Sequence, residues 1–301
     1  MRKTGFSLAL FGLLAVVSLP TTSAHAQATR TWVSGVGDDA NPCSRTAPCK
    51  TFAGAISKTA AGGEIDCLDP GGFGAVTITK SMTIDCAGVT GGILSSLTNG
   101  VIVNAGVNDK VVLRNLNIQG VGNGINGVRW LAGKELQLDR VTLAGFTNAG
   151  VDISKSAAGT LFVTNSYFTE AAIGINMTST APFVIASVDN SNFNGLTTNG
   201  VAVGSNSIAN ITSSTFSSNS VTGATVSASG SFLNLNKNVF RNNGTGISAV
   251  AGTNLRTIDN DLFDNTTGIN ATGAGWVSAG NNRVVGGSTI SNGTSSVMQV
   301  R

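Results

Sequence analysis

The feature that most constrains this chain is a repeated unit of about 23–25 residues, a period within the range of solenoid proteins. In each copy an Asn-rich turn precedes a large apolar residue, and a Gly-aliphatic pair follows, as in Asn165, Phe168 and Gly174-Ile175. We call the large apolar residues the anchors: Ile118, Leu143, Phe168, Phe193, Phe216, Phe240 and Phe263. Such a unit cannot bury its apolar face alone, so it must stack on its neighbours.

Apolar and polar residues alternate within each unit, and this alternation predicts short β-strands. Leu136 and Leu138 form one such pair, and Val151 and Ile153 form another. Three short strands per unit, separated by bends, predict an all-β parallel β-helix of about ten coils, roughly 50 Å long at ~4.8 Å per coil. The alternative is an antiparallel sandwich or barrel, which shows hairpin signals at about 8–12-residue spacing without a repeat of the whole unit. The repeat favours the solenoid.

One position of the unit, three residues before the anchor, is rich in Asn: Asn115, Asn165, Asn190 and Asn260. Asn tolerates the left-handed backbone conformation of a tight bend. Its side-chain amide can also bond to the same amide one coil away, as in other stacked strands. We therefore interpret these residues as structural and expect them to form a ladder along the bends.

Residues 1–26 are expected to be a secretory signal peptide. Met1-Arg-Lys supplies a basic start, Phe6 to Leu19 an apolar stretch, and Ala24-His25-Ala26 a small-residue cleavage site. A membrane anchor is the alternative, but the apolar stretch is shorter than the ~20 residues that span a bilayer. We expect secretion to the periplasm or the extracellular space after cleavage near Ala26, and no membrane span in the remaining chain.

Charged side chains are scarce, at 11% of the chain compared with about 25% in an average domain. Without Arg2 and Lys3, the 18 basic residues fall to 16, against 15 acidic residues. This balance provides no basic surface for nucleic acid. Chains rich in Gly, Ser, Thr and Asn can be disordered, but the regularly spaced Phe, Ile, Val and Leu residues supply a core that disordered chains lack.

Residues 27–63 are expected to form an N-terminal cap with a strand, a disulfide loop and a helix, and residues 64–301 the β-helix. The strand begins at Thr31 and leads into a loop rich in Gly, Asp and Asn. The helix is predicted over Lys50–Ala61, where Phe52, Ala55, Ile56 and Thr59 follow helical spacing and two glycines come directly after.

Four cysteines, Cys43, Cys49, Cys67 and Cys86, predict two disulfides in a secreted chain. Cys43 and Cys49 flank a short, turn-rich loop. Cys67 and Cys86 each end an Ile-Asp-Cys triplet, which places them at equivalent positions of adjacent coils, close enough to bridge. The sequence alone permits three pairings. A metal site is the competing interpretation, but the chain has no CxxC spacing and no mature His to complete a tetrahedral site.

The segment TWVSGVGDDANPC from Thr31 to Cys43, with PCKTFAGAI from Pro48 to Ile56, resembles the opening of secreted bacterial right-handed β-helix proteins of the pectin-lyase-like superfamily. The segment GEIDCLDPG from Gly63 is similar to the strand and turn that follow in that group. The resemblance covers nearly the whole mature chain and implies a right-handed parallel β-helix whose first coil is capped by a short helix. It is specific for fold only, because the superfamily includes lyases, hydrolases, epimerases, tailspikes and non-catalytic surface proteins.

The catalytic signatures of that superfamily are mostly missing. Polygalacturonase-like members carry an Asn-Thr-Asp start, an Asp pair and a Gly-His-Gly motif, and pectate-lyase-like members carry calcium-binding Asp residues with an Arg-x-x-x-x-Arg region; the repeats contain neither pattern. The only histidine, His25, lies in the predicted signal peptide. The mature chain therefore has no imidazole for acid–base, nucleophilic or zinc chemistry.

The remaining candidates for catalysis lie in the column four residues before the anchors: Arg114, Asp139, Thr164, Asp189, Thr212, Asn236 and Asp259. Asp139 and Asp189 are expected two coils apart, roughly 9.6 Å. This is the upper edge of the ~6.5–9.5 Å that separates the carboxyl groups of an inverting glycosidase. Any outward column has this spacing, so a solvated face is the competing interpretation.

Asp259, Asp261 and Asp264 form the densest acidic cluster of the chain, and carboxylate oxygens suit calcium. The glycine and closing Glu of an EF-hand are absent, and so is the nonapeptide Gly-Asp repeat. Calcium at this cluster is the one cofactor that the sequence suggests, and otherwise no cofactor is expected.

Three tryptophans and Tyr167 offer aromatic surface on which sugar rings can stack. Trp32 is expected to pack at the cap and Trp276 in the last coils. Trp130 follows a strand that begins at Gly127; we expect it to be exposed and to be the carbohydrate-stacking residue. The anchor phenylalanines are expected inside the rod.

Two functions fit these observations. The first is a secreted, non-catalytic β-helix protein of the envelope or extracellular space that binds polysaccharide or a cell-surface glycan along its faces. The second is a polysaccharide-active lyase or glycoside hydrolase. The missing motifs, the lost histidine and the low charge favour the first function, while the resemblance and the acidic column support the second. The sequence carries no signal for an oligomeric state.

Overall fold

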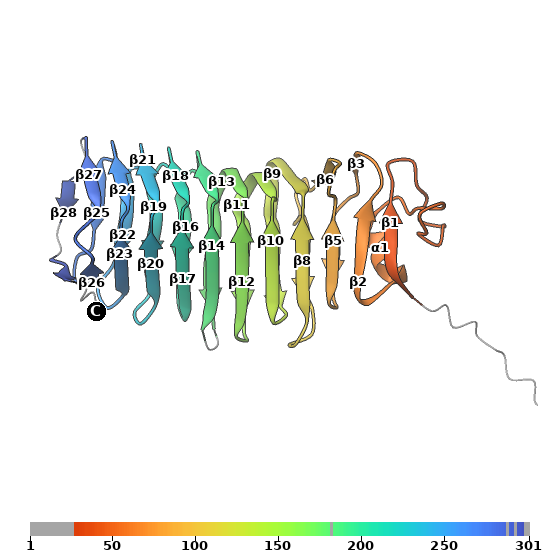
Figure 1. Ribbon diagram of the computed structural model, residues 1–301, viewed down its shortest axis with the longest axis horizontal. Helices are drawn as coiled ribbons and strands as arrows, with labels where there is room; N and C mark the ends of the chain where they lie inside the picture. Colours follow the sequence, from red (N-terminus) through yellow and green to blue (C-terminus); the bar gives the residue numbers. More distant parts are fainter. Residues whose placement is uncertain (1–26, 181–182, 287–288, 292–293, 298–301) are drawn as a thin grey trace, which may run out of the picture.

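The chain is a parallel β-helix, as predicted, in a computed structural model that describes residues 27–180, 183–286, 289–291 and 294–297. The predicted signal peptide, residues 1–26, lies outside this part of the chain. Figure 1 shows the coils stacked along one axis, from the N-terminal cap to the last strands. Strands of neighbouring coils pair in parallel at the spacing of the repeat.

Within the described residues, twelve strands form the first sheet. They are β1 (Ala28–Val33), β2 (Thr59–Cys67), β5 (Met82–Asp85), β8 (Lys110–Arg114), β10 (Glu135–Asp139), β12 (Gly159–Thr164), β14 (Val184–Asp189), β17 (Ser207–Thr212), β20 (Phe232–Asn236), β23 (Asn254–Ile258), β26 (Gly275–Ser278) and β29 (Ser296–Val297). In β10 the buried residues Leu136 and Leu138 alternate with polar residues that point outward. The period of two therefore gives this sheet one apolar inner face and one polar outer face.

The other strands form a second sheet, which closes the coil around the same core. They are β3 (Gly71–Gly72), β4 (Val76–Ile78), β6 (Gly91–Leu94), β7 (Val101–Asn104), β9 (Leu116–Ala132), β11 (Thr142–Lys155), β13 (Tyr167–Ser179), β15 (Asn192–Asn194), β16 (Asn199–Val203), β18 (Thr215–Ser217), β19 (Thr222–Val226), β21 (Val239–Arg241), β22 (Thr245–Ala249), β24 (Asp261–Phe263), β25 (Thr267–Asn270), β27 (Arg283–Val285) and β28 (Thr289–Ser291). In the middle coils one long strand bends along this path. In the later coils two short strands follow it.

The anchors stack as rings in the interior. Phe168, Phe193, Phe216 and Phe240 are fully buried, and the centroids of neighbouring rings lie 4.6–4.8 Å apart with planes within 11° of parallel. Leu143 pairs with Phe168 and continues this column toward the N-terminus. The predicted interior position of these phenylalanines is confirmed, and their burial is a large part of what holds neighbouring coils together.

The prediction that Phe263 is the last anchor is wrong. Leu262 pairs with Phe240 and is fully buried, whereas Phe263 pairs with Arg241 and is half-buried. This coil is shorter than the assumed repeat, because Asn260 is bonded to the equivalent Asn238 only 22 residues earlier. The column four residues before the anchors shifts in the same way, so it ends in Ile258 and not in Asp259, since Asn236 pairs with Ile258.

The glycine of each Gly-aliphatic pair is required by the close approach of the next coil. A Cβ added to Gly223 would lie 2.7 Å from the carbonyl oxygen of Gly246 and 2.7 Å from Cδ1 of Phe240. The aliphatic residue that follows this glycine, such as Ala224 after Gly223 in β19, points into the core. Gly therefore recurs after each anchor because a side chain at this position would clash with the neighbouring coil.

The bend between the two sheets places one residue per coil in the left-handed region, with φ of 45–56°: Asn115, Arg140, Asn165, Asn190, Ser213, Lys237 and Asp259. The predicted ladder is confirmed at Asn165 and Asn190, where Asn190 Nδ2 donates to Asn165 Oδ1 at 2.7 Å. The prediction that Asn260 belongs to this ladder is wrong. Asn260 lies one position further along, buried, and donates to Asn282 Oδ1 at 2.9 Å within an inner ladder.

The cap contains one short helix, α1 (Phe52–Lys58), which begins after the N-cap Thr51, whose Oγ1 accepts a hydrogen bond from Gly54 N at 2.9 Å. The predicted range of Lys50–Ala61 is too long at both ends. Thr59 already has extended backbone angles, and it pairs with Ala28 as the first residue of β2. Pairing with β1 thus ends the helix before the two glycines. Because β1 and β2 are neighbours, the cap strand belongs to the first sheet of the β-helix.

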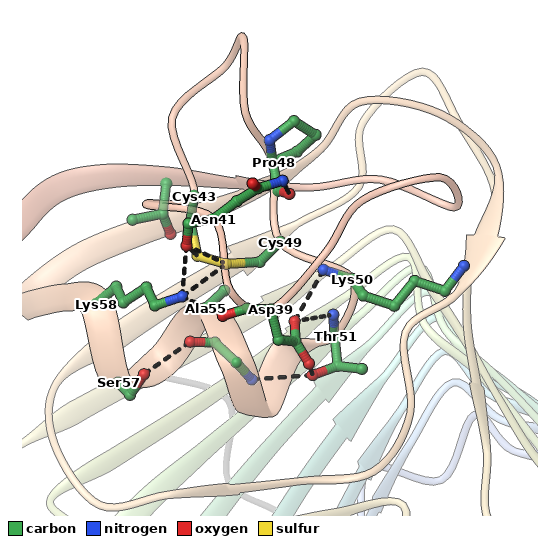
Figure 2. The surroundings of a disulfide bond; sticks show 12 residues. Asp39, Asn41, Cys43, Pro48, Cys49, Lys50, Thr51, Ala55, Ser57 and Lys58 are labelled. Carbon is green, nitrogen blue, oxygen red and sulfur yellow. Dashed lines mark hydrogen bonds between the residues drawn. A yellow bond between two sulfur atoms is a disulfide. The ribbon is translucent and has the colours of Figure 1, made fainter.

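Both predicted disulfides are present. Cys43 and Cys49 close the cap loop with a Cα–Cα distance of 4.6 Å, and Cys67 and Cys86 join β2 to the residue after β5 with a Cα–Cα distance of 4.7 Å. Figure 2 shows the first bridge above α1, where Lys58 Nζ donates to the carbonyl oxygens of Asp39 and Asn41. The loop and the helix are therefore tied together by covalent and polar contacts.

Candidate functional site

An open cleft of about 450 Å³ lies over the N-terminal end of the first sheet, and we call it the N-terminal cleft. Its charged and aromatic lining residues come from β1, β2, β5 and the cap loop: Arg30, Trp32, Arg45, Glu64, Asp66 and Asp85. Trp32 pairs in register with Asp66, and Asp66 pairs with Asp85. One outward column across three strands therefore brings an aromatic ring and two carboxylates together.

Strand alternation decides which of these side chains reach the cleft. In β1 the buried residues Thr31 and Val33 flank Trp32, whose side chain points outward and is half-buried. In β2 the same alternation turns Glu64 and Asp66 outward. The site is thus built on rigid, paired strands and not on a loop.

The carboxylates of the cleft are held in place by one arginine. Arg30 Nε donates to Asp66 Oδ2, and Arg30 Nη2 donates to Glu64 Oε1 at 3.3 Å. A hydrogen bond to Asp66, together with partial burial and the negative charge of Asp66, raises the pKa of Glu64. The nearby charge of Asp85 acts in the same direction. The Glu64 carboxyl group therefore retains its proton to a higher pH than a free Glu does.

Trp32 forms the rim between two hollows. The second hollow, of about 720 Å³, lies toward the cap and is lined by Asn41, Pro42 and Lys58 as well as by Trp32. The Cζ atom of Arg30 lies 5.8 Å from the centroid of the Trp32 ring, within the range of a cation–π contact. The indole thus presents an oriented apolar face at the edge of a polar site.

The prediction that Trp130 is exposed and stacks on carbohydrate is wrong. Trp130 is fully buried, because it lies two positions after the inward Val128 and pairs with Val103 and Ile153 of the core. Its Nε1 donates to the carbonyl oxygen of Ala132 at 3.1 Å. Trp276 is also buried, as expected, so Trp32 is the tryptophan that reaches the surface.

A lysine covers the buried indole of Trp130. Lys155 Nζ lies 4.2 Å from the ring centroid and donates to the carbonyl oxygen of Gly133 at 2.5 Å. Only 2% of Lys155 is exposed, and burial lowers its pKa to about 8. This cation is enclosed by the core and is not part of the surface site.

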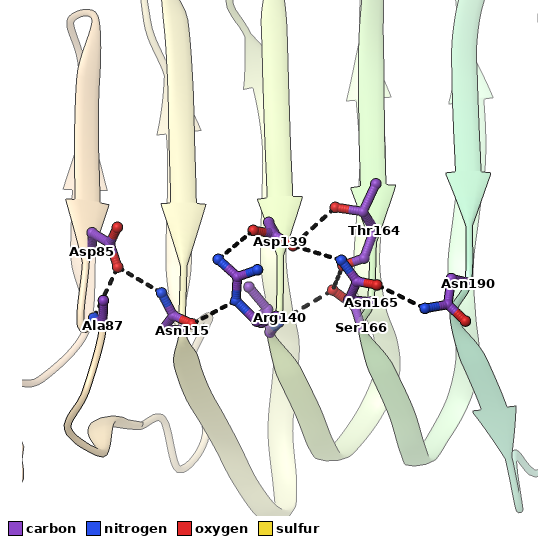
Figure 3. A network of polar contacts seen from close by, with 10 residues as sticks. Asp85, Ala87, Asn115, Asp139, Arg140, Thr164, Asn165, Ser166 and Asn190 are labelled. Carbon is purple, nitrogen blue, oxygen red and sulfur yellow. Dashed lines mark hydrogen bonds and ion pairs between the residues drawn. The ribbon is translucent and has the colours of Figure 1, made fainter.

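Asp139 and Asp189 occupy the column that the sequence predicted, on β10 and β14 with Thr164 between them. Figure 3 shows Asp139 within a network of side chains that runs from Asp85 through Asn115, Arg140 and Asn165 to Asn190. Asp139 Oδ1 accepts from Thr164 and Asn165, both at 3.0 Å, and Asp139 Oδ2 lies 2.7 Å from Arg140 Nη2. Both oxygens of Asp139 thus have partners that join neighbouring coils.

Asp189 is less engaged than Asp139, since its Oδ1 accepts one hydrogen bond from Thr212 Oγ1 at 2.7 Å. At the other end of the network, Asp85 Oδ1 accepts from Asn115 Nδ2 at 2.7 Å and from the backbone N–H of Ala87 at 2.9 Å. The network therefore starts in the N-terminal cleft and continues along the outer edge of the first sheet.

The proposed calcium ligands have other contacts. Arg283 forms ion pairs with Asp259 and Asp261. Asp259 and Asp264 adopt left-handed bend conformations, with φ of 51° and 52°, on either side of β24. Within the residues that the structure describes, no three acidic, Cys or His side chains converge as a metal-binding group. Calcium at Asp259, Asp261 and Asp264 stays a prediction without an assembled ligand set.

A second pair of opposite charges lies on the second sheet. Arg129 pairs in register with Asp152, and Arg129 Nε lies 3.9 Å from Asp152 Oδ2. Asp152 also accepts from Asn176 Nδ2 and Ser154 Oγ, both at 2.9 Å. The carboxylate of Asp152 is therefore satisfied by its neighbours, and its side chain is only 9% exposed, compared with 39% for Glu64 in the N-terminal cleft.

The sequence did contain a signal for the cleft. The two Ile-Asp-Cys triplets place Asp66 and Asp85 between buried residues, so both carboxylates had to point outward from adjacent strands. Trp32 likewise lies between Thr31 and Val33, whose side chains point into the core. What the sequence lacked was the pairing of β1 with β2, which brings Trp32 next to Asp66.

The chemistry of this arrangement suits a hydroxyl-rich ligand. Carboxylates accept hydrogen bonds from hydroxyl groups, guanidinium groups donate them, and an indole offers a flat apolar face. None of the helices in the described ranges is long and apolar enough to cross a membrane.

Comparison with known proteins supports the fold directly. The family model described as the right-handed β-helix region matches residues 99–263, which is more than half of the chain. A search of curated protein sequences finds no matching relative.

Solved structures with the same architecture include a pectate lyase, a bacteriophage tailspike domain and a lacto-N-biosidase. Pectate lyase Pel9A has a TM-score of 0.59 and 13% identity over 90% of this chain and 79% of its own. The enzymatically active domain of bacteriophage CBA120 tailspike protein 2 has a TM-score of 0.60 and 14% identity over 78% of this chain; the match spans 40% of that protein. The GH136 lacto-N-biosidase from Eubacterium ramulus has a TM-score of 0.60 and 11% identity over 89% of this chain and 66% of its own. At such identities the likeness establishes the fold, and with the family match it shows that the chain belongs to the right-handed β-helix family.

Proposed function

We propose that this chain is a secreted carbohydrate-binding β-helix protein that holds a glycan in the N-terminal cleft without cleaving it. The observation that carries the proposal is the half-exposed indole of Trp32 beside the outward carboxylates of Glu64 and Asp66. A sugar ring has an apolar C–H face that packs on an aromatic ring, and a rim of hydroxyl groups that bond to carboxylates.

The two disulfides support secretion. Structural disulfides form and persist outside the cytosol, and the bridges Cys43–Cys49 and Cys67–Cys86 close the cap and the first coils. The low charge of the chain and the leader-like residues 1–26 point in the same direction.

The named neighbours support a carbohydrate ligand at the level of the fold. A pectate lyase and a lacto-N-biosidase act on carbohydrate, and both share this architecture. Because a fold hosts many functions, the argument for this chain rests on the cleft itself.

The geometry of the acidic residues favours binding over cleavage. Glu64 and Asp66 lie two positions apart on the same face of one strand and both bond to Arg30, whereas the two catalytic carboxyl groups of a glycosidase flank the scissile bond. Both oxygens of Asp139 have partners, Thr164 and Asn165 of the next coil on Oδ1 and the adjacent Arg140 on Oδ2. Neither group resembles an acid and a base on opposite sides of a scissile bond.

A polysaccharide lyase or glycoside hydrolase is the second candidate function. The raised pKa of Glu64 is the observation that favours it, since a carboxyl group that keeps its proton to higher pH is better suited to act as a general acid. Asp139 and Asp189 would supply further acidic groups on the same sheet face.

Affinity electrophoresis of the purified mature protein tests binding. Gels would contain neutral polysaccharides (β-glucan, mannan, xylan) or anionic ones (polygalacturonate, alginate). We expect at least one polysaccharide to retard the protein, and Trp32→Ala to weaken that interaction about tenfold, equivalent to ~1.4 kcal/mol. Tyr167→Ala is the control, because Tyr167 is an exposed aromatic residue on the second sheet, outside the cleft. Equal retardation of wild type and Trp32→Ala would contradict the proposal.

Turnover is measured on the same polysaccharides, with and without calcium, from new reducing ends and unsaturated uronides. We expect neither product. Product formation that is abolished by Glu64→Gln, Asp139→Asn or Asp189→Asn would establish the enzyme instead and identify its acidic group.

A further inference from the structure

The outer face of the first sheet carries an exposed apolar patch in its middle coils. Its most exposed members are Phe162 on β12, Ile185 on β14, and Phe183, two residues earlier in the same extended chain; they are 39%, 37% and 44% exposed. Ile208 and Phe232, half-buried, continue the column of Ile185, because Ile185 pairs with Ile208 and Ile208 with Phe232. We call these five residues the apolar patch.

The fold does not require apolar residues at these positions. The inward residues of the same strands, such as Leu161 and Val163, already fill the core. At equivalent outward positions other coils carry polar residues: Phe162 pairs with Gln137 on one side and Ser187 on the other. Contiguous exposed apolar groups of this kind mark interaction surfaces in soluble proteins.

The patch and the N-terminal cleft lie on one continuous surface. Trp32 is on β1 and Phe162 on β12, which are separated by five strand-to-strand steps in the first sheet. At ~4.8 Å per step the two aromatic residues are about 24 Å apart along the rod. Figure 1 shows the intervening strands side by side with no element crossing them on this sheet.

Several charges between the two places are paired, and Arg114 on β8 adds a cation in register between Asp85 and Asp139. Lys110 Nζ lies 3.2 Å from Glu135 Oε2 on neighbouring strands, and Asp139 is engaged by Arg140. In the patch itself the neighbouring charge is Arg256, whose Cζ lies 5.1 Å from the ring of Phe232. The strip therefore offers hydrogen bonds and apolar faces with few charges of either sign, among them Asp189 on β14, while three carboxylates gather in the cleft beside Arg30 and Arg45.

This distribution selects among glycans. At the cleft a polyanion such as a polyuronate meets three carboxylates, Glu64, Asp66 and Asp85, against two guanidinium groups, Arg30 and Arg45, so the net charge that it meets there is negative. A polycation finds no carboxylate among the residues of the apolar patch. An uncharged chain meets no electrostatic penalty at either end, and its alternating C–H faces and hydroxyl groups match both ends.

We propose that the first sheet binds one extended, uncharged polysaccharide chain at two subsites, the N-terminal cleft around Trp32 and the apolar patch around Phe162. The inference rests on the proposed carbohydrate-binding function and extends it to a second subsite and a ligand class. Binding at two linked subsites raises affinity through effective concentration, so a ligand long enough to span both should bind much more tightly than a short one.

Isothermal titration with neutral glucan, mannan and xylan, each as polymer and as a two-residue fragment, tests this inference. The variants are Trp32→Ala, the double variant Phe162→Ser/Ile185→Ser, and the control Leu94→Ser, which changes a 61% exposed residue of the second sheet. We expect the double variant to weaken polymer binding at least tenfold, to leave fragment binding unchanged, and to keep the wild-type circular dichroism spectrum. Leu94→Ser should match wild type.

The outcomes distinguish a failure of the second subsite from a failure of the proposed carbohydrate-binding function. If Trp32→Ala weakens binding but the double variant equals wild type, the cleft stands and the second subsite is wrong. If only polygalacturonate or alginate binds, the inferred ligand class is wrong. If no polysaccharide binds, the proposed function and the inference both fail.

Discussion

The indole of Trp32 and the carboxylate of Asp66 lie at the same register position of adjacent strands, on the outer face of the first sheet. Arg30 contacts both, since its Cζ lies 5.8 Å from the ring and its Nε donates to Asp66. A site that combines an aromatic face with an oriented carboxylate is therefore fixed by the pairing of β1 with β2. The cap disulfide closes the loop that pairs with β1 and contributes Arg45 to the same cleft.

Phe216→Ala should lower the free energy of unfolding by about 3–5 kcal/mol, the usual range for a buried Phe. The ring is fully buried and stacks 4.8 Å from Phe193 and 4.7 Å from Phe240. Urea denaturation followed by circular dichroism measures the effect. Phe183→Ala, at an exposed position, is the control and should cost less than about 1 kcal/mol. Equal losses would mean that the ring of Phe216 is not in the core.

Leu262→Ala should cost about 2–5 kcal/mol of unfolding free energy, and Phe263→Ala clearly less, although the phenyl group is larger. Leu262 is fully buried against Phe240, while Phe263 is half-buried beside Arg241. Denaturation curves of the two variants decide the register of this coil. A greater loss of unfolding free energy for Phe263→Ala would show that Phe263, and not Leu262, is the buried anchor of this coil.

Gly223→Ala should destabilise the fold by about 1–3 kcal/mol through overpacking. The added methyl group would approach the Gly246 carbonyl and the Phe240 ring at 2.7 Å. Gly72→Ala is the matched control, because no atom lies within 4 Å of its added Cβ and its change should stay within about 0.5 kcal/mol. Thermal melts measure the Tm of both variants. Equal shifts of the two Tm values would contradict the close approach of neighbouring coils at Gly223.

Lys155 should make the stability of the fold depend on pH above about pH 8. Burial lowers its pKa from 10.5 to about 8, so between these values the unfolded chain binds more protons than the folded chain. The free energy of unfolding contributed by this group therefore rises with pH across that window and is constant below it. Lys155→Met removes the linkage, and the stability of the variant relative to wild type should fall as pH rises from 8 to 10. A difference that does not change with pH would show that the amine keeps its ordinary pKa.

The anchors of the middle coils could be predicted because Phe168, Phe193 and Phe216 stand at nearly constant distances before a Gly-aliphatic pair. The last anchor could not, because Leu262 and Phe263 are both large and apolar, and only the 22-residue spacing of the inner Asn ladder distinguishes them. The helix was extended too far for a similar reason: local spacing favours helix up to Ala61, but pairing with β1 imposes a strand.

The functional site was harder to predict than the fold, because it depends on contacts between segments that are distant in the sequence. Counting in steps of two from Val128 would have turned Trp130 inward, so its burial was within reach of the sequence. Trp32 was harder, because it precedes the repeat and no neighbouring coil defines its face. The raised pKa of Glu64 arises from Asp66 and Asp85, and the latter comes close only when β5 pairs with β2.

Quenching of tryptophan fluorescence by acrylamide tests the central claim most directly. Trp130 and Trp276 are buried and Trp32 is half-exposed, so Trp32 should supply the quenchable fluorescence, and Trp32→Phe should remove it. The account predicts that a bound neutral polysaccharide protects this fluorescence from acrylamide, with half-maximal protection at the concentration that half-saturates binding. A polysaccharide that binds while the quenching of Trp32 stays unchanged would contradict the placement of the glycan in the N-terminal cleft.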